Sequence, residues 1–151
     1  METNSNRNTA TLMQLSALTQ YLIPFGNFIF PILIWSSTKD KSEYLDAQGK
    51  QVINFQLSVF LYSFILGLIA IPILLVTLLR NLSIYDISNC DNLQFRNINI
   101  ESINGAVIVA IIAVILFIAI KASEFFLTII AALKASNGET YKYPFTINFL
   151  K

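Results

Sequence analysis

The chain has 151 residues, of which 55% are hydrophobic and only 13% are charged. Soluble domains carry about 25% charged residues, so this composition excludes an ordinary soluble protein and indicates a membrane protein. Ten basic and nine acidic residues leave a net charge of +1, which excludes the strongly basic surface typical of nucleic-acid binding. Histidine is absent and Cys90 is the single cysteine, so we expect no metal site, no cofactor and no internal disulfide.

The hydrophobic pattern predicts an all-α membrane protein with a small bundle of three transmembrane helices and an extended C-terminal tail. Polar residues 1–10 predict a disordered N-terminal tail, without the pattern of a cleaved signal peptide. The remainder, 11–151, is expected to form a single integral membrane domain. Its parts are the hydrophobic segments 12–35, 57–79 and 106–133, an outside loop over 80–104 and an interfacial tail over 137–151.

The first hydrophobic segment, 12–35, is long enough to cross a bilayer as one straight helix. Pro24, Gly26 and Asn27 stand in its middle, where they favour a break or a turn. The segment is therefore either a kinked transmembrane helix or a re-entrant hairpin of two short helices, which would make four helices in all.

The second helix is predicted to begin in polar sequence and to continue into the membrane. Asp40 or Ser42 offers an N-cap, and the i, i+4 spacing of Asp46 and Lys50 predicts an ion pair that supports the helix. No charged residue occurs over 51–79. We therefore expect one continuous helix that is amphipathic at its start, at the membrane surface, and that crosses the membrane further on.

The third segment, 106–133, contains two charged residues, Lys121 and Glu124. Their i, i+3 spacing allows them to pair. An ionisable group inside a membrane span is a candidate for transport, whereas a lysine that reaches the headgroups and pairs with a glutamate is structural. We favour the structural interpretation. Asn137 and Gly138 then end the helix, because both tolerate the left-handed conformation.

The tail alternates aromatic or apolar side chains at the odd positions of 141–149 with mostly polar ones at the even positions. A period of two predicts an extended segment with two different faces. We expect it to lie along the lipid headgroups or against the protein's own cytoplasmic surface. A short paired strand is the alternative.

The distribution of lysine and arginine predicts the orientation in the membrane. Cytoplasmic loops carry an excess of these residues. The 36–54 connection and the residues after 133 together hold six of them, against three elsewhere outside the spans, and the ratio becomes seven to two if the first segment is re-entrant. We therefore expect a multi-pass protein of the bacterial inner membrane with a cytoplasmic C-terminus and the 80–104 loop outside.

Three motifs occur in a recognisable order: Leu22 to Asn27, Asp46 to Gln56, and Ala135 to Phe145. Together they resemble the small bacterial membrane proteins of the domain-of-unknown-function 4870 (DUF4870) family, which are grouped as distant relatives of a chloroplast inner-envelope protein-import (Tic) subunit. The family usually has a histidine where this chain reads Ala47-Gln48-Gly49. The resemblance implies that the three motifs belong together, and it implies little about mechanism.

Glycines and amides dominate these motifs, and such residues commonly serve close helix packing in membranes. We expect them to form one cytoplasm-side cluster that stabilises the bundle, with no catalytic, cofactor or metal residue among them. The cluster consists of Pro24, Gly26, Asn27, Gly49, Asn54, Gln56, Asn137, Gly138, Tyr143 and Pro144.

An enzyme is not expected, because no pattern of a nucleophile and a base accompanies the acidic residues. The favoured function is an accessory or scaffold protein for membrane protein assembly or translocation. The alternative is an oligomeric small-solute or ion transporter or channel that uses Lys121 and Glu124. Expected partners are the lipid bilayer and either a membrane protein or further copies of the chain, and nucleic acid is not among them.

Overall fold

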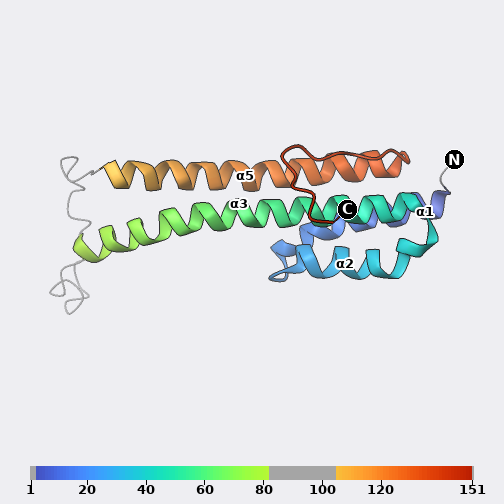
Figure 1. Ribbon diagram of the computed structural model, residues 1–151, viewed down its shortest axis with the longest axis horizontal. Coiled ribbons are helices and arrows are strands. Elements are labelled where there is room, and N and C mark those ends of the chain that lie inside the picture. Colours follow the sequence, from blue (N-terminus) through green and yellow to red (C-terminus); the bar gives the residue numbers. More distant parts are fainter. Residues whose placement is uncertain (1–2, 82–104, 151) are drawn as a thin grey trace. The chain divides into compact units, whose positions relative to one another are not determined.

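The computed structural model describes residues 3–81 and 105–150. Most of the expected outside loop, including Cys90, lies outside the described residues. The described residues form helices and irregular segments without a strand, so the expected all-α class is confirmed. The elements are α1 (Asn4–Ser16), η1 (Ala17–Tyr21), α2 (Gly26–Thr38), η2 (Lys39–Lys41), α3 (Glu43–Asn81) and α5 (Gly105–Ser136), where η marks a 3-10 helix (Figure 1).

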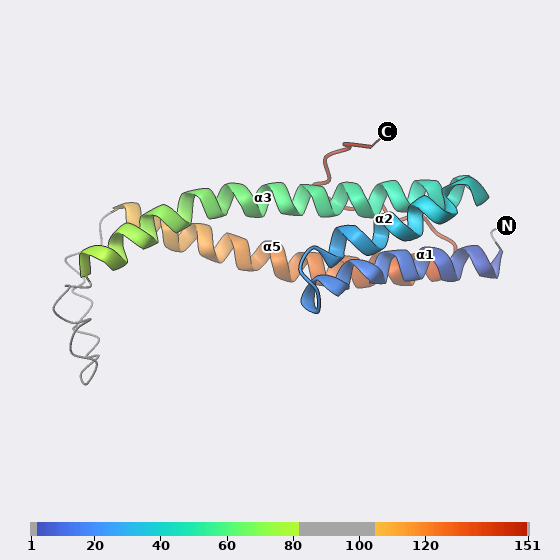
Figure 2. The ribbon, with the colours of Figure 1, turned by 90° about the horizontal axis from the view of Figure 1, so that it is seen from below.

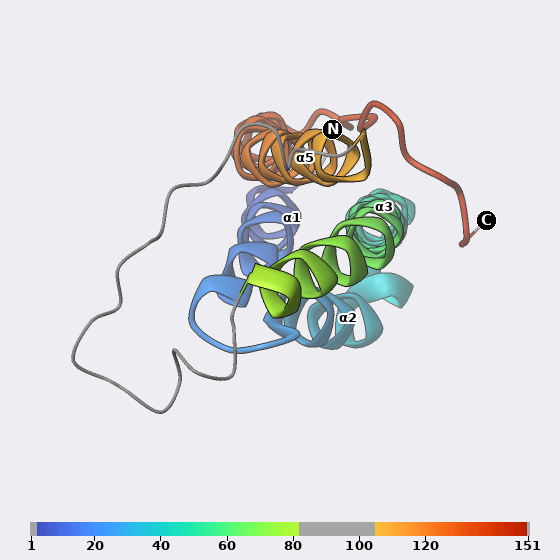
Figure 3. The ribbon, with the colours of Figure 1, turned by 90° about the vertical axis from the view of Figure 1, so that its left-hand side faces the viewer.

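The chain divides into two compact units, which we describe separately. Unit 1 comprises Met1–Tyr62 and Ile120–Lys151, and unit 2 comprises Ser63–Ala119. Unit 1 therefore contains α1, α2, the first part of α3, the last part of α5 and the C-terminal tail. Within it, α1 and the start of α3 lie between α2 on one side and the end of α5 on the other (Figure 3).

The first hydrophobic segment is a helical hairpin, so the prediction of three transmembrane helices is wrong. Among the described residues, two helices are long and apolar enough to cross a membrane, within Glu43–Thr77 and Gly105–Ser136. The hairpin turns at Pro24, which has no N–H to continue a helix, and at Phe25, whose φ of 62° is left-handed. α1 and α2 then lie side by side (Figure 2).

The N-terminal residues also differ from the prediction, because α1 begins at Asn4. The side chain of Thr3 caps the helix by accepting a hydrogen bond from the Asn6 N–H at 3.3 Å. Ala10 is fully buried against Tyr44, Leu45 and Ala135. Residues 4–10 are therefore ordered by tertiary packing that their polar composition does not reveal.

The start of α3 has the predicted local chemistry. The Ser42 hydroxyl accepts the Leu45 N–H at 3.2 Å, which makes Ser42 the N-cap. Lys50 pairs with Asp46 at 2.6 Å. One turn further on, Val52 and its neighbours enter a core cluster with α1, in which the buried members are Met13, Ala17, Val52 and Ile53.

Unit 2 consists of the second part of α3 and the first part of α5, as far as it is described. Its buried apolar side chains are the small ones of Ala70, Ala110 and Ala113. Small residues let membrane helices approach closely. Large apolar side chains such as Leu68 and Ile115 are exposed, and a surface of this kind requires apolar surroundings.

After α5 the chain turns at Gly138, whose φ is 80°. The Glu139 N–H donates to the Lys134 carbonyl at 3.0 Å, which closes the helix end. A side chain at position 138 would also meet the guanidinium group of Arg7. Beyond this turn the tail is not the regular extended segment that its alternating pattern predicts, because it turns again at Pro144 and Phe145, where the φ of Phe145 is 55°. The tail does not form a paired strand, and it lies against the protein's own α3.

Candidate functional site

Unit 1 buries an unusual number of polar side chains for so small a core. Burial of an amide or a carboxylate costs free energy unless it is hydrogen-bonded. The partners of these groups therefore show which contacts stabilise the unit. The buried polar residues are Gln14, Asn27, Gln48, Asn54, Gln56, Ser58, Glu124 and Thr128.

A chain of hydrogen bonds joins α1, α3 and the tail. The amide of Gln14 donates to Gln48 Oε1 at 2.8 Å, and the amide of Gln48 donates to the Glu139 carbonyl at 2.9 Å. The Tyr143 hydroxyl donates to Gln14 Oε1. Burial raises the pKa of Tyr143 above its ordinary value, so this hydroxyl stays protonated as the contact requires. The Tyr143 ring stacks on Phe55 with 4.0 Å between centroids.

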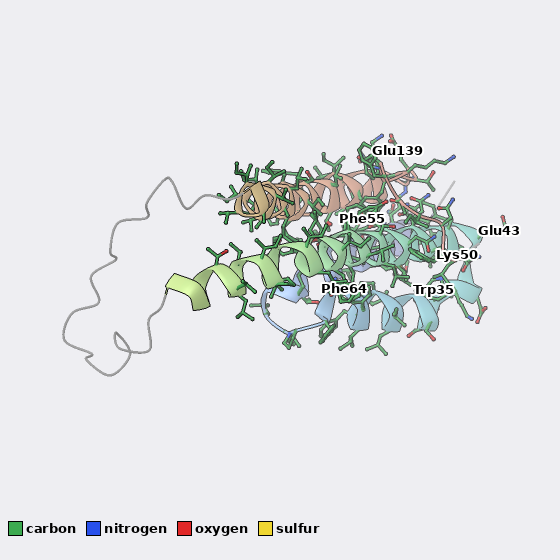
Figure 4. The ribbon with its side chains drawn as sticks, turned by 60° about the vertical axis from the view of Figure 1, so that its left-hand side comes forward. Trp35, Glu43, Lys50, Phe55, Phe64 and Glu139 are labelled. Atoms are coloured by element: carbon green, nitrogen blue, oxygen red, sulfur yellow. The ribbon has the colours of Figure 1, made fainter. Side chains whose placement is uncertain are left out.

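Two contacts attach α2 to α3. Asn27 Nδ2 donates to Gln56 Oε1 at 2.9 Å, deep in the unit. Trp35 Nε1 donates to Asp46 Oδ1 at 2.9 Å near the start of α3. The Trp35 ring lies directly on Gly49, where even a Cβ atom would overlap it. In Figure 4, Trp35 lies on α2 at the polar end of the unit, near the labelled Lys50.

A third contact attaches the tail to α3 through three side chains, Asn54, Ser58 and Tyr62, which we call the α3 clamp. Asn54 donates to the Leu150 carbonyl at 2.9 Å and accepts the Leu150 N–H at 2.8 Å. Ser58 accepts the Ile147 N–H at 2.8 Å, and the Tyr62 hydroxyl donates to the Phe145 carbonyl at 2.9 Å. Each bond reaches the tail's main chain, so the clamp holds the backbone of the tail without using the tail's side chains.

A fourth contact attaches η1 to α5. Lys121 Nζ pairs with Glu124 Oε2 at 2.6 Å, and the Gln20 amide donates to Glu124 Oε1 at 2.8 Å. Lys121 also donates to Gln20 Oε1 at 3.2 Å. The Glu124 side chain is fully buried whereas that of Lys121 is 34% exposed. Both carboxylate oxygens of Glu124 therefore accept a hydrogen bond within the triad of Gln20, Lys121 and Glu124.

The family of the chain follows from a comparison with protein-family models. The model called MamF/MmsF, described as the magnetosome magnetite crystal formation protein family, matches residues 5–150. This chain belongs to the MamF/MmsF family. No curated protein and no solved structure matches the chain significantly.

Membership of the MamF/MmsF family corrects the family expected from the motifs. The assignment to the DUF4870 family is wrong, and the comparisons show no similarity to a chloroplast import subunit. The match covers both units of this MamF/MmsF chain, including α1 and the tail. The contacts described above therefore lie within the matched residues.

The structure distributes the predicted motif cluster over separate contacts of unit 1. Gly26, Asn27, Gly49, Asn54, Gln56 and Tyr143 are buried, whereas Pro24, Asn137 and Pro144 are exposed and Gly138 lies between these extremes. Asn27 and Gln56 contact each other directly. Asn54 and Gly49 face different elements, the tail and α2 respectively.

Several residues of the site were missed. Gln14 and Gln20 could have been noticed as amides near or within the first apolar segment. Ser58 follows Asn54 by four residues, which places it on the same helical face. Tyr62 also belongs to the site, because its hydroxyl donates to the Phe145 carbonyl of the tail. Among the described residues, no group of three or more histidine, cysteine, aspartate or glutamate side chains could hold a metal ion.

Proposed function

We propose that the protein is a membrane-embedded accessory protein that acts in magnetite crystal formation without being an enzyme. The observation that carries this proposal is the family match over residues 5–150, because it includes the packed polar unit as well as both apolar helices. The site supports an accessory role, since its amide, hydroxyl and ion-pair contacts serve to position elements.

The proposed place of the protein is a lipid bilayer crossed by α3 and α5. Only 11% of the residues in the most apolar stretch of each helix are buried, so most of their apolar side chains need surroundings other than this chain. The cluster of Ala10, Tyr44, Leu45 and Ala135 brings the start of α1, the start of α3 and the end of α5 together. Both termini would then lie on the lysine-rich, cytoplasmic side.

In this proposal unit 1 is a preformed body at the membrane surface. Four sets of hydrogen bonds link α1, η1, α2, α3, α5 and the tail, so a partner would meet a defined surface instead of a flexible one. The partner class we propose is another integral membrane protein or a further copy of this chain.

Transport by an oligomer is the second candidate, and the buried Glu124 is the observation that favours it. Its two oxygens already accept hydrogen bonds from Lys121 and Gln20. A transported ion would have to break these bonds. For this reason we prefer the accessory function.

Deleting the gene in its host tests the proposal. We expect crystals of altered size or number by electron microscopy, restored by the wild-type gene and by a Lys121→Leu/Glu124→Leu double variant. Purification in mild detergent should recover a defined membrane partner or a homo-oligomer. Crystals that are unchanged after the deletion, or a wild-type host that forms no magnetite, would refute the role in crystal formation. Failure of only the double variant to restore the crystals would favour transport.

A further inference from the structure

The last residues of the tail, 145–150, form a ribbon with a defined orientation. Main-chain groups of Phe145, Ile147 and Phe149 point toward α3, where the α3 clamp binds them. Phe145 has a left-handed φ of 55°, and the Phe149 N–H also donates to the Ile147 carbonyl at 3.1 Å, so the ribbon is irregular and contains turns. Its main chain is held by the hydrogen bonds to α3, which include both main-chain groups of Leu150.

The clamp binds the ribbon at three successive levels of α3. Its three residues recur every four positions along α3, a rise of about 6 Å. Tyr62 binds Phe145, Ser58 binds Ile147, and Asn54 binds Phe149 and Leu150. The ribbon is therefore held along about 12 Å of α3.

Three large apolar side chains of this ribbon are exposed. Phe145 is 88% exposed, Ile147 39% and Phe149 48%. The intervening Asn148 is polar and also exposed. Because the main chain supplies the bonds to α3, these three large side chains are not needed to hold the tail, and water is an unfavourable surrounding for them.

The clamp also places the ribbon beyond the last charge of the helix start. Asn54 and Tyr62 lie about 6 Å and about 18 Å along α3 from Lys50, in the charge-free sequence. At the same level, Phe60 and Leu61 of α3 are exposed. Lysines flank the ribbon in sequence at positions 142 and 151, and lysine suits anionic headgroups.

We infer that residues 145–150 are a lipid-binding ribbon, in which Phe145, Ile147 and Phe149 enter the boundary between headgroups and acyl chains. This inference rests on the proposed membrane location and adds a second attachment to the bilayer besides α3 and α5. The α3 clamp satisfies part of the ribbon's main chain, as an apolar surrounding requires, while the three apolar side chains stay exposed for contact with lipid.

Site-directed spin labelling in liposomes of zwitterionic and anionic lipid tests the inference. In a Cys90→Ser background, single cysteines replace Ile147, Asn148 or Leu68. Collision rates with oxygen report lipid exposure, and those with a water-soluble nickel chelate report water exposure. We expect a ratio of oxygen to nickel collisions several-fold higher at position 147 than at position 148.

Leu68, an exposed side chain of α3 in unit 2, separates this inference from the membrane proposal. Lipid exposure at 68 with equal ratios at 147 and 148, or with water exposure at 147, would overturn the ribbon alone. Water exposure at 68 would overturn both the ribbon and the membrane location.

Variants of the clamp test its part in the inference. Asn54→Ala with Ser58→Ala should abolish the difference between 147 and 148, whereas Thr77→Ala, whose hydroxyl bonds to Ile73 within α3, should preserve it. A difference that survives loss of the clamp would also contradict the inference.

Discussion

Single residues decide how closely the helices of unit 1 approach. The clearest case is Gly49, which lies under the Trp35 ring while Trp35 Nε1 bonds to Asp46 one turn earlier. The indole is therefore fixed by a hydrogen bond and cannot move aside freely. By contrast, Gly67 further along α3 has only Ile71 nearby, at 3.7 Å from where a Cβ would stand.

We expect Gly49→Ala to destabilise the protein by about 1–3 kcal/mol through overpacking. The matched control, Gly67→Ala, adds the same methyl group in free space and should be neutral or slightly stabilising, because alanine favours helix. Thermal unfolding in detergent measures both. Equal midpoints for Gly49→Ala and wild type would show that α2 does not pack on α3 as described.

The triad of Gln20, Lys121 and Glu124 gives a second prediction for side chains. Lys121→Ala leaves the buried carboxylate with the amide alone, so it should destabilise. The loss should be smaller than the about 3–5 kcal/mol of a fully buried pair, since Lys121 is partly exposed. The double change of Lys121 and Glu124 to leucine should be tolerated better than Lys121→Ala in the same unfolding assay. A double variant less stable than the single one would mean that the ion pair itself is required.

The element that departs most from its local sequence is the hairpin of α1 and α2. Phe25 adopts the left-handed conformation, which costs a residue other than glycine about 1 kcal/mol or more. Its side chain is exposed, so packing is not the reason for this conformation. The turn exists because Gly26 and Asn27 must reach Thr19 and Gln56 respectively.

Substitutions at Phe25 can therefore test the turn. Glycine adopts a positive φ without strain, whereas a β-branched residue there is a true outlier. We expect Phe25→Gly to unfold at a higher temperature than Phe25→Val, with a difference on the order of 1 kcal/mol. The opposite order would indicate a continuous helix through residues 22–26.

For the whole molecule, the proposed topology places both termini on one side of the membrane. Arg7 beside Gly138 supports this placement, because it brings the start of α1 to the end of α5. In a Cys90→Ser background, cysteines at the exposed Asn8 and Ser136 should both resist an impermeant thiol reagent until the membrane is opened. Native Cys90 should react in intact spheroplasts. Labelling of position 8 but not of position 136 would place the N-terminus outside.

Interactions within one helix were predictable from the sequence. The Asp46–Lys50 and Lys121–Glu124 pairs, the Ser42 cap and the helix end at Gly138 all formed as their spacing indicated. These contacts join residues three to five positions apart, and helical geometry alone brings such residues together. The apolar lengths of α3 and α5 were likewise evident, because a bilayer demands a minimum run of apolar residues.

Contacts between elements depended on the tertiary structure. Gln14 bonds to Gln48, 34 positions away, and Tyr143 bonds to Gln14 across 129 positions. No periodicity relates such residues, since their meeting depends on how the helices turn and pack. The same reason explains the choice of a hairpin over a kinked span for 12–35. The breaker residues allow both, and the amides that α2 and α3 bury against each other favour the hairpin.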